Sequence, residues 1–371
     1  MTILLAGGGT AGHINPAISI ANYIKERHPE AKICFAGTPK GMEANLVPKA
    51  GYEFYPVDVK GFQRKLSLKN IGRNIEAAVK VFTSSIQAGG ILKKTAPDLV
   101  IGTGGYVSGP VLRKAAKMGI KTAIHEQNAF PGVTTKMLAP HMDAVMLAME
   151  DAKKHLPSNR EYVVTGNPVR EEVIRADKQK SRRALGLDER PVILSFGGSL
   201  GARTINEMAA DIIAWHWKDA KYQHLHATGR YGVELMPRLL REKGVELEKA
   251  PQVRITEYID NMDECMAAAD LVICRSGAIA LSELEAQGKA SILIPSPNVA
   301  ENHQYHNAMS LARRGAAVVI EEKELTAERM IAELNRLLVH PGTLREMGQN
   351  AKNEAVLDAN ERIYQVLMGL L

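Results

Sequence analysis

The chain has 371 residues, of which 45% are hydrophobic and 24% charged, and this composition excludes a wholly disordered or collagen-like protein. Its length is typical of two domains. The net charge of +6 is uneven, because residues 1–167 hold 21 lysines and arginines against 12 acids, whereas the remainder holds 26 against 29. A local excess of cations indicates an anionic partner, and both nucleic acid and an anionic membrane surface fit this pattern.

The cysteines and the hydropathy pattern indicate a reducing compartment. Cys34, Cys265 and Cys274 are odd in number and widely spaced, which suits neither a disulfide framework nor a zinc site. No apolar run approaches the roughly 18–20 residues that span a bilayer. A strand and a glycine loop follow the N-terminus so closely that we expect no signal peptide. We therefore expect a cytoplasmic protein.

Apolar runs alternate with amphipathic stretches through the first half of the chain. The pattern predicts strands at 3–6, 32–37, 98–105 and 121–128, with helices at 16–28, 41–51 and 111–119 between them. Strands that alternate with helices are typical of a parallel, doubly wound sheet.

The second half repeats this order. Residues 191–203 read as a strand and a glycine turn, with a helix following to about Trp217, and 270–288 as strand, turn and helix; further strands are predicted at 222–229, 253–259 and 289–297. The sequence thus predicts an α/β fold of two Rossmann-like doubly wound parallel-sheet domains facing a central cleft. We place the domains at 1–167 and 168–343, with a break near Pro168, followed by a C-terminal helix at 344–371 that could pack on the first domain.

Four glycine-containing loops, 7–13, 102–109, 197–201 and 275–278, follow predicted strands. Gly7, Gly9 and Gly12 satisfy G-x-G-x-x-G, but no acid ends the second strand, as a dinucleotide site requires, and His13 stands where a P-loop needs lysine. Glycines and helix N-termini nevertheless bind phosphate well. The alternative is a set of tight turns without a ligand. A protein with two such domains would suit a donor and an acceptor that both carry phosphate.

Three residues at predicted strand ends or on the helices that follow them are candidates for chemistry. His13 at the start of a helix is a candidate general base, although it could instead pack the loop. Glu126 ends a predicted strand and could assist as a base, orient His13, or be a solvated acid. Glu283 could accept two hydrogen bonds from a ribose diol, or complement a helix dipole. No metal-ligand cluster is evident, so we expect neither a metal nor a cofactor.

An ordered set of motifs resembles the MurG-type peptidoglycan N-acetylglucosaminyltransferases over residues 3–310. The motifs are Gly8-Gly9-Thr10-Ala11-Gly12-His13 with Asn15-Pro16-Ala17, Gly104-Gly105-Tyr106-Val107-Ser108-Gly109-Pro110, His125-Glu126-Gln127-Asn128, Gly166-Asn167-Pro168-Val169-Arg170, Gly197-Gly198-Ser199, Arg275-Ser276-Gly277-Ala278 with Ser282-Glu283, and Asn302-His303-Gln304 with Asn307-Ala308. The chain departs from the family at Leu200, where glutamine is usual.

The resemblance implies the GT-B fold and an inverting transfer of N-acetylglucosamine from UDP-N-acetylglucosamine to the C4 hydroxyl of the muramyl sugar of lipid I, giving lipid II and UDP. It implies His13 and Glu126 as catalytic residues and the second domain as the donor site, with Ile259 at uracil and Glu283 at ribose. The implied donor-site residues are Thr10, Ala11, Gly12, Asn128, Arg170, Ser199, Ile259, Ala278, Ile279, Ala280, Leu281, Ser282, Glu283 and Gln304. Those implied for the acceptor are Gly9, Gly104, Gly105 and Tyr106.

The basic segment 60–94 suits this interpretation. It carries eight lysines and arginines against one acid, Glu76, and mixes them with apolar residues such as Phe62 and Phe82. Such a mixture favours peripheral attachment to anionic lipid on the cytoplasmic face of the bacterial cell membrane, although an ordinary solvated face is the alternative.

Two other functions stay open. A UDP-N-acetylglucosamine epimerase on the same fold would need no acceptor. A non-enzymatic nucleic-acid-binding protein could use the basic face, but the strongest motifs lie on the glycine loops and no aromatic-rich RNA motif is visible, so we expect no nucleic-acid partner.

Overall fold

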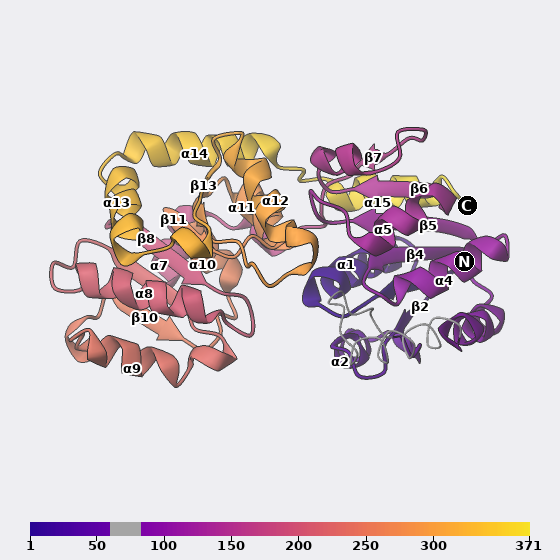
Figure 1. The fold of residues 1–371 in the computed structure, drawn as a ribbon, viewed down its shortest axis with the longest axis horizontal. Coiled ribbons are helices and arrows are strands. Elements are labelled where there is room, and N and C mark those ends of the chain that lie inside the picture. The colour runs from indigo at the N-terminus through magenta and orange to yellow at the C-terminus, as the bar shows by residue number, and fades with distance from the viewer. Residues whose placement is uncertain (60–82) are drawn as a thin grey trace. The chain divides into compact units, whose positions relative to one another are not determined.

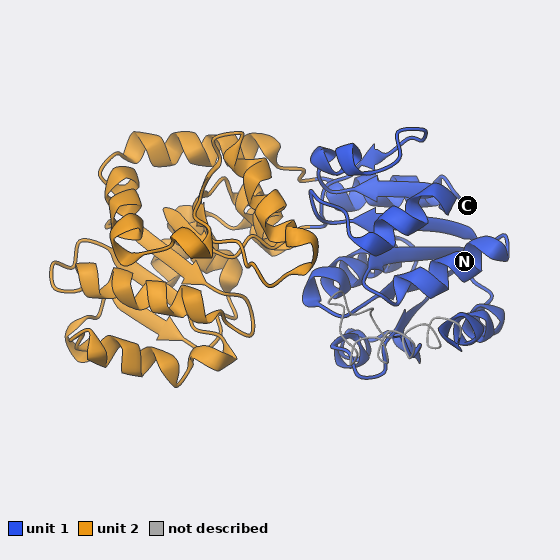
Figure 2. Cartoon of the chain, in the orientation of Figure 1, with its two compact units in different colours: residues 1–168, 358–371 blue, residues 169–357 orange. Residues whose placement is uncertain are grey.

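The computed structural model describes residues 1–59 and 83–371, which form two compact units. In each unit, helices pack on a parallel sheet (Figure 1). Unit 1 comprises Met1–Pro168 and Asp358–Leu371, and unit 2 comprises Val169–Leu357 (Figure 2). The predicted α/β class with two doubly wound parallel sheets is confirmed.

The sheet of unit 1 has seven strands in the order β3-β2-β1-β4-β5-β6-β7, and every pair is parallel. The strands are β1 (Thr2–Gly7), β2 (Lys32–Gly37), β3 (Glu53–Pro56), β4 (Leu99–Gly104), β5 (Lys121–Glu126), β6 (Ala144–Leu147) and β7 (Val163–Val164). The helices are α1 (Ala11–Arg27), α2 (Glu43–Lys49), a helix at 83–95, α4 (Ser108–Lys117), α5 (Val133–Leu138) and α15 (Ala359–Met368).

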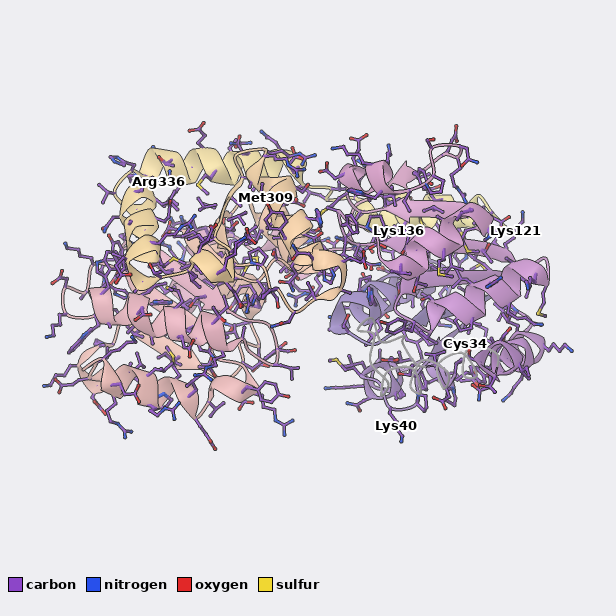
Figure 3. All side chains as sticks on the ribbon, viewed as in Figure 1. Cys34, Lys40, Lys121, Lys136, Met309 and Arg336 are labelled. Carbon is purple, nitrogen blue, oxygen red and sulfur yellow. The ribbon has the colours of Figure 1, made fainter. Side chains whose placement is uncertain are left out.

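The central strands are continuous apolar runs because both faces of the sheet are covered. Successive β1 side chains enter opposite cores, Leu4 one and Ile3 and Leu5 the other. Cys34 on β2, labelled in Figure 3, is wholly buried and carries a free thiol. Burial raises the pKa of that thiol to about 11, so it is inert at neutral pH.

The segment 344–371 contains a break rather than one helix. Helix α14 (Pro341–Glu354) belongs to unit 2, Ala355 leaves it in an extended conformation, and α15 belongs to unit 1. Helix α15 packs on α1, since Ile363 and Leu367 share its apolar cluster and Tyr23 Oη donates to Glu361 Oε2 at 2.6 Å. The two helices belong to different units because the apolar face of α14 packs in the core of unit 2 and that of α15 packs in the core of unit 1.

Unit 2 contains a six-stranded parallel sheet in the order β10-β9-β8-β11-β12-β13. The strands are β8 (Val192–Phe196), β9 (Gln223–Ala227), β10 (Val253–Thr256), β11 (Leu271–Cys274), β12 (Ala290–Leu293) and β13 (Ala317–Val319). The helices besides α14 are α6 (Glu171–Arg175), α7 (Lys178–Ala184), α8 (Arg203–His216), α9 (Leu235–Glu242), α10 (Met262–Ala268), α11 (Ala278–Gln287), α12 (His303–Ala312) and α13 (Ala327–Leu338).

Each sheet has one point at which the order of its strands reverses. The chain moves outward from β1 through β2 to β3 and then returns to place β4 on the other side of β1. In unit 2 the chain likewise moves from β8 through β9 to β10 and then returns to place β11 on the other side of β8. Parallel sheets bind ligands at the carboxyl ends of the strands beside such a reversal. The loops after β1, β4, β8 and β11 therefore mark the candidate site in each unit.

Neither a membrane-spanning helix nor a metal-binding cluster is found in residues 1–59 and 83–371. No helix there is both long and apolar enough to cross a bilayer. No group of three or more His, Cys, Asp or Glu side chains is arranged there to hold a metal ion.

Candidate functional site

The loop after β1 leads directly into α1. Gly9 has a φ of +86°, and a Cβ there would meet no atom within 4 Å, so the loop surface is open at this point. His13 N and Ile14 N both donate to Thr10 O. The amides of Ala11 and Gly12 precede these bonds in the first turn, where amides lack helical acceptors and attract anions.

The amide of Gly9 is already bonded to a buried acid. Gly9 N donates to Glu43 Oε2 at 3.0 Å, and Glu43 Oε1 accepts from Thr38 N and Thr38 Oγ1 at 2.9 and 2.6 Å. Burial raises the pKa of Glu43, but these hydrogen bonds outweigh it and the pKa is lowered. Sequence reasoning missed Glu43 because it sought an acid at the end of β2, whereas α2 supplies it from further along the chain.

The loop after β4 lies against the loop after β1. Gly104 and Gly105 have φ of +108° and +79°, and a Cβ on Gly105 would lie 2.3 Å from the carbonyl oxygen of Gly8. Ser108 Oγ lies 2.7 Å from both Ala6 O and Gly104 O, and its single hydrogen can be donated to either oxygen. The neighbouring Tyr106 is 60% exposed. Only glycine fits the contact between these two backbones.

His13 is half-buried and bonds to a residue that the sequence analysis did not single out. Its Nδ1 lies 3.1 Å from Oε1 of Gln127, which follows β5 and is 2% exposed. Gln127 Nε2 lies 3.0 Å from His125 Nδ1, and His125 Nε2 lies 2.9 Å from the carbonyl oxygen of Gly166. A hydrogen-bonded chain thus links His13 to the backbone at the end of unit 1's sheet.

Glu126 lies on the opposite side of the strand end and does not contact His13. Its Oε1 accepts from Asn128 N and Asn128 Nδ2, both at 3.0 Å. Its Oε2 accepts from Gly132 N at 3.1 Å and from Thr135 Oγ1 at 2.5 Å. Lys136, labelled in Figure 3, lies 3.7 Å from the ring centroid of Phe130 in the same loop. Both carboxylate oxygens therefore serve to hold the loop at 126–135.

The loop after β8 is shaped by a second pair of glycines. A Cβ on Gly201, which has a φ of +82°, would lie 2.1 Å from Thr228 O, and one on Gly229 would lie 2.0 Å from Gly201 N. This contact presents Ser199 to solvent ahead of the N-terminus of α8. Leu200 is 50% exposed and uses its carbonyl to accept from Tyr231 N.

The loop after β11 leads into α11, which carries most of the predicted donor residues. Ala278, Leu281 and Ser282 are buried, and Ile279, Ala280 and Glu283 are partly exposed. Arg170 Nε and Nη2 both donate to Glu283 Oε1 at 3.2 Å. Burial raises the pKa of Glu283, and Arg170 opposes that rise.

The remaining donor candidates lie on neighbouring segments of unit 2. Ile259 is 8% exposed in the loop between β10 and α10. Gln304 Oε1 accepts from Ser296 N at 2.9 Å in the first turn of α12. That turn is entered through Glu301 and Asn302, which both have positive φ, a strain common at binding sites. Asn307 Nδ2 donates to Ser276 O at 3.2 Å and so ties α12 to the loop after β11.

Within each unit the structure brings most of the predicted residues together. In unit 1, Gly9, Thr10, His13, Gly104 and Gly105 lie at the ends of the adjacent strands β1 and β4. In unit 2, the loops with Ser199 and Ala278 follow strands whose last residues, Phe196 and Cys274, are paired. In open parallel sheets, ligands bind beside paired loops of this kind at a strand-order reversal.

Comparison with known proteins gives the class first. The glycosyltransferase family 28 N-terminal domain matches residues 3–147, and the family 28 C-terminal domain matches residues 192–363. The protein is therefore a glycosyltransferase. A crystal structure of Acinetobacter baumannii MurG covers 99% of this chain and of that chain, with a TM-score of 0.78 and 27% identity, in agreement with the predicted GT-B fold.

Full-length relatives then narrow the class. A protein of Acetivibrio thermocellus is 44% identical over 372 residues, covering 100% of this chain and 98% of its own. One of Caldanaerobacter subterraneus is 45% identical over 368 residues, covering 99% of each. Both are named UDP-N-acetylglucosamine–N-acetylmuramyl-(pentapeptide) pyrophosphoryl-undecaprenol N-acetylglucosamine transferase. The chain belongs to this family of transferases, which confirms the resemblance.

The epimerase alternative shares only the fold. A UDP-GlcNAc 2-epimerase from Neisseria meningitidis, crystallised with UDP-GlcNAc, covers 100% of both chains with a TM-score of 0.64 but 15% identity. Sequence similarity therefore distinguishes the transferase from the epimerase, whereas the fold does not.

Proposed function

We propose that this protein transfers N-acetylglucosamine from UDP-N-acetylglucosamine to the C4 hydroxyl of the muramyl sugar of lipid I, giving lipid II and UDP. The observation that carries the proposal is full-length similarity, at 44% identity, to a transferase whose name states this donor and a pyrophosphoryl-undecaprenol acceptor. The glycine loops at the strand-order reversal of each sheet support it, because both substrates carry a diphosphate.

Unit 2 holds the donor nucleotide in this proposal. Ile259 contacts uracil through its backbone, and Glu283 accepts from the ribose hydroxyls. Arg170 engages only Oε1 of Glu283, and no hydrogen bond within residues 1–59 and 83–371 uses Oε2, which leaves that oxygen for ribose. Ser199 and the first turn of α11, residues 278–282, hold the diphosphate. Gln304 contacts the sugar.

Unit 1 holds the acceptor and supplies the base. The loops at 7–13 and 102–109 meet the acceptor diphosphate, and Thr10, Ala11, Gly12 and Asn128 lie near the transferred sugar of the donor. The N–H of Gly9 is already donated to Glu43. In this proposal Gly9 therefore meets the acceptor through its open surface and not through its amide. His13 accepts the proton of the C4 hydroxyl as that oxygen attacks the anomeric carbon. Because both oxygens of Glu126 are engaged, we assign it to holding the loop that carries Asn128.

The leaving group departs as UDP in one displacement, which inverts the anomeric configuration. Negative charge grows on the donor diphosphate as its bond to the sugar breaks. Backbone amides fixed at a helix N-terminus stabilise such charge without reorganising. The rigid glycine contact at Gly201 and Gly229 keeps the loop with Ser199 in place for that role.

We further propose that the protein attaches peripherally to the cytoplasmic face of the bacterial membrane, where a lipid-linked acceptor resides. The support is the basic and apolar composition of segment 60–94. Residues 60–82 of that segment lie outside the described residues, and 83–94 are helical.

The test is a transfer assay with radiolabelled UDP-N-acetylglucosamine and a lipid I analogue in the presence of EDTA. We expect labelled disaccharide-lipid, and a loss of kcat by a factor of about 10²–10⁴ in His13→Ala, as for removal of a general base. Consumption of the donor without acceptor would favour the epimerase and contradict the proposal. Full activity in His13→Ala would remove His13 as the base while leaving the transferase assignment.

A further inference from the structure

The hydrogen bonds around His13 fix more than its position. His13 is joined through Nδ1 to Gln127 Oε1, and Gln127 and His125 are at least 98% buried. Water therefore does not compete for the contacts that Gln127 and His125 make with each other and with Gly166. The donor and the acceptor of each hydrogen bond in this series can be assigned in turn, starting from the carbonyl oxygen of Gly166.

The carbonyl oxygen of Gly166 can only accept, so His125 Nε2, at 2.9 Å, carries the hydrogen. His125 is wholly buried, and burial lowers its pKa, so the ring is neutral and Nδ1 has a lone pair.

Gln127 is oriented by the same residue. One atom of its amide lies 2.9 Å from the carbonyl oxygen of His125 and 3.0 Å from His125 Nδ1. Both of those partners are acceptors, so this atom must be the nitrogen, and its two hydrogens are both used. The amide oxygen therefore faces His13.

An amide oxygen can only accept, so His13 Nδ1 is the donor. A neutral imidazole has a single N–H, and the lone pair then lies on Nε2. Within the described part of the chain, no protein hydrogen bond engages this Nε2. Gly104 packs on the ring so closely that a Cβ there would lie 2.6 Å from Nδ1, which restricts rotation of the ring.

We propose that Gln127 and His125 are positioning residues that hold His13 in the tautomer whose Nε2 can take the acceptor's proton. The proposal rests on the proposed function. The C4 hydroxyl gives its proton to Nε2, its oxygen bonds to the anomeric carbon, and the bond from that carbon to the diphosphate breaks with the electron pair leaving on UDP. Nδ1 keeps its hydrogen bond to Gln127 throughout. A neutral amide fixes the tautomer without adding a charge beside the base.

The first test is the tautomer in the full-length wild-type protein. Nitrogen NMR of protein labelled with ¹⁵N-histidine distinguishes a protonated from an unprotonated ring nitrogen, and the His13 signal is assigned by its loss in His13→Asn. We expect hydrogen on Nδ1 and a lone pair on Nε2. A neutral His13 with hydrogen on Nε2 would overturn the proposal.

The second test removes the amide. In Gln127→Leu and in Gln127→Met we expect a mixture of tautomers and a kcat lower by about 10- to 100-fold, with the KM for UDP-N-acetylglucosamine nearly unchanged. Gln127→Glu keeps an acceptor facing His13, so it should retain the Nδ1–H tautomer and recover part of the lost kcat. Gln223→Leu is the matched control, because it removes a buried glutamine that bonds Asp188 and Arg190 in unit 2. The control should change neither readout.

These outcomes separate the two proposals. Unchanged kcat and tautomer in folded Gln127 variants, together with a large loss in His13→Ala, would overturn the positioning role alone. Full activity in His13→Ala would instead show that the base lies elsewhere. If the leucine and methionine variants fail to fold, the wild-type spectrum and the Gln127→Glu variant decide.

Discussion

His13 and Gln127 are 114 positions apart, and the sequence suggested a role for His13 but gave Gln127 only as a member of the motif His125-Glu126-Gln127-Asn128. A strand alternates its side chains between two faces, so His125 and Gln127 share one face of the β5 end and Glu126 and Asn128 share the other. The observed contacts follow this alternation. The alternation of side chains along a strand would have predicted that His13 lies near His125 and Gln127 rather than near Glu126. No sequence pattern could have shown that Glu43 reaches back to Gly9.

Glu126 provides a prediction at the same scale. In Glu126→Gln, an amide nitrogen replaces one of two buried acceptor oxygens and meets a donor. We expect a loss of about 1–3 kcal/mol in unfolding free energy, from the mispaired buried group, and a lower Tm. The pH profile of kcat should keep its shape, measured by the transfer assay from pH 5 to 9.

The control is Glu150→Gln, because Glu150 is exposed and its ion pair with Lys153 lies at the surface. It should leave Tm almost unchanged. Loss of one limb of the pH profile in Glu126→Gln would show that Glu126 itself exchanges the proton.

At the scale of elements, the central strands and the loops after them were predictable, because buried parallel strands are continuous apolar runs that end in glycine. The edge strand β3 could not be recognised, since it has only four residues and both of its ends, Glu53 and Pro56, are exposed. β13 has only three residues. The break between α14 and α15 depends on which core each helix enters, and that is a tertiary property.

The glycine contact beneath the donor loop gives a second prediction. Gly201→Ala places a methyl group 2.1 Å from Thr228 O, so the loop with Ser199 must move. We expect the KM for UDP-N-acetylglucosamine to rise by about tenfold or more, since several amide contacts depend on the loop. Gly244→Ala is the control, because Gly244 also has a positive φ, of +69°, but no atom within 4 Å of the added carbon. It should cost about 1 kcal/mol of stability and leave this KM unchanged.

A buried histidine chain in unit 2 gives a third. Ser195 Oγ lies 2.8 Å from His224 Nε2 and 2.7 Å from His226 Nδ1, and His216 stacks on His224. Burial lowers the pKa of His216 and of His226 to about 4, and that of His224 well below its usual value. The unfolded chain, with histidine pKa values near 6.5, binds more protons than the folded protein below that pH. Stability is therefore complete above about pH 6.5 and falls as the pH drops toward 4.

The magnitude can be measured with the two tryptophans, Trp215 and Trp217, which both lie in unit 2. We expect each depressed histidine to cost roughly 2 kcal/mol between pH 7 and pH 5 in urea unfolding followed by fluorescence. His216→Phe should make this pH dependence shallower, whereas the exposed His340→Gln should not. An equal slope in wild type and His216→Phe would contradict the assignment.

At the scale of the whole molecule, the two units differ in charge, and this asymmetry yields a prediction about membranes. Arg64, Lys65 and Lys69, which lie outside the described residues, are replaced together by glutamate. Each cation near an anionic surface contributes about 1 kcal/mol, so binding to anionic vesicles should weaken at least tenfold and should be salt-sensitive in the wild type. Sedimentation with anionic and neutral vesicles measures this.

The control reverses three exposed cations of unit 2, Lys221, Arg238 and Lys249. It changes the net charge by the same amount and should leave vesicle binding intact. Equal sedimentation of the wild type with both kinds of vesicle would contradict peripheral attachment through segment 60–94.

The return of α15 to unit 1 has a consequence for biosynthesis. A ribosome releases every residue of unit 2 before it releases Asp358–Leu371, yet Ile363 and Leu367 complete the apolar cluster on α1. The nascent N-terminal half must wait, with that strip of α1 uncovered, until all of unit 2 and then α15 have been synthesised. The later-made half can finish folding first, so the order of maturation is the reverse of the order of synthesis, and the uncovered strip is where a chaperone would act.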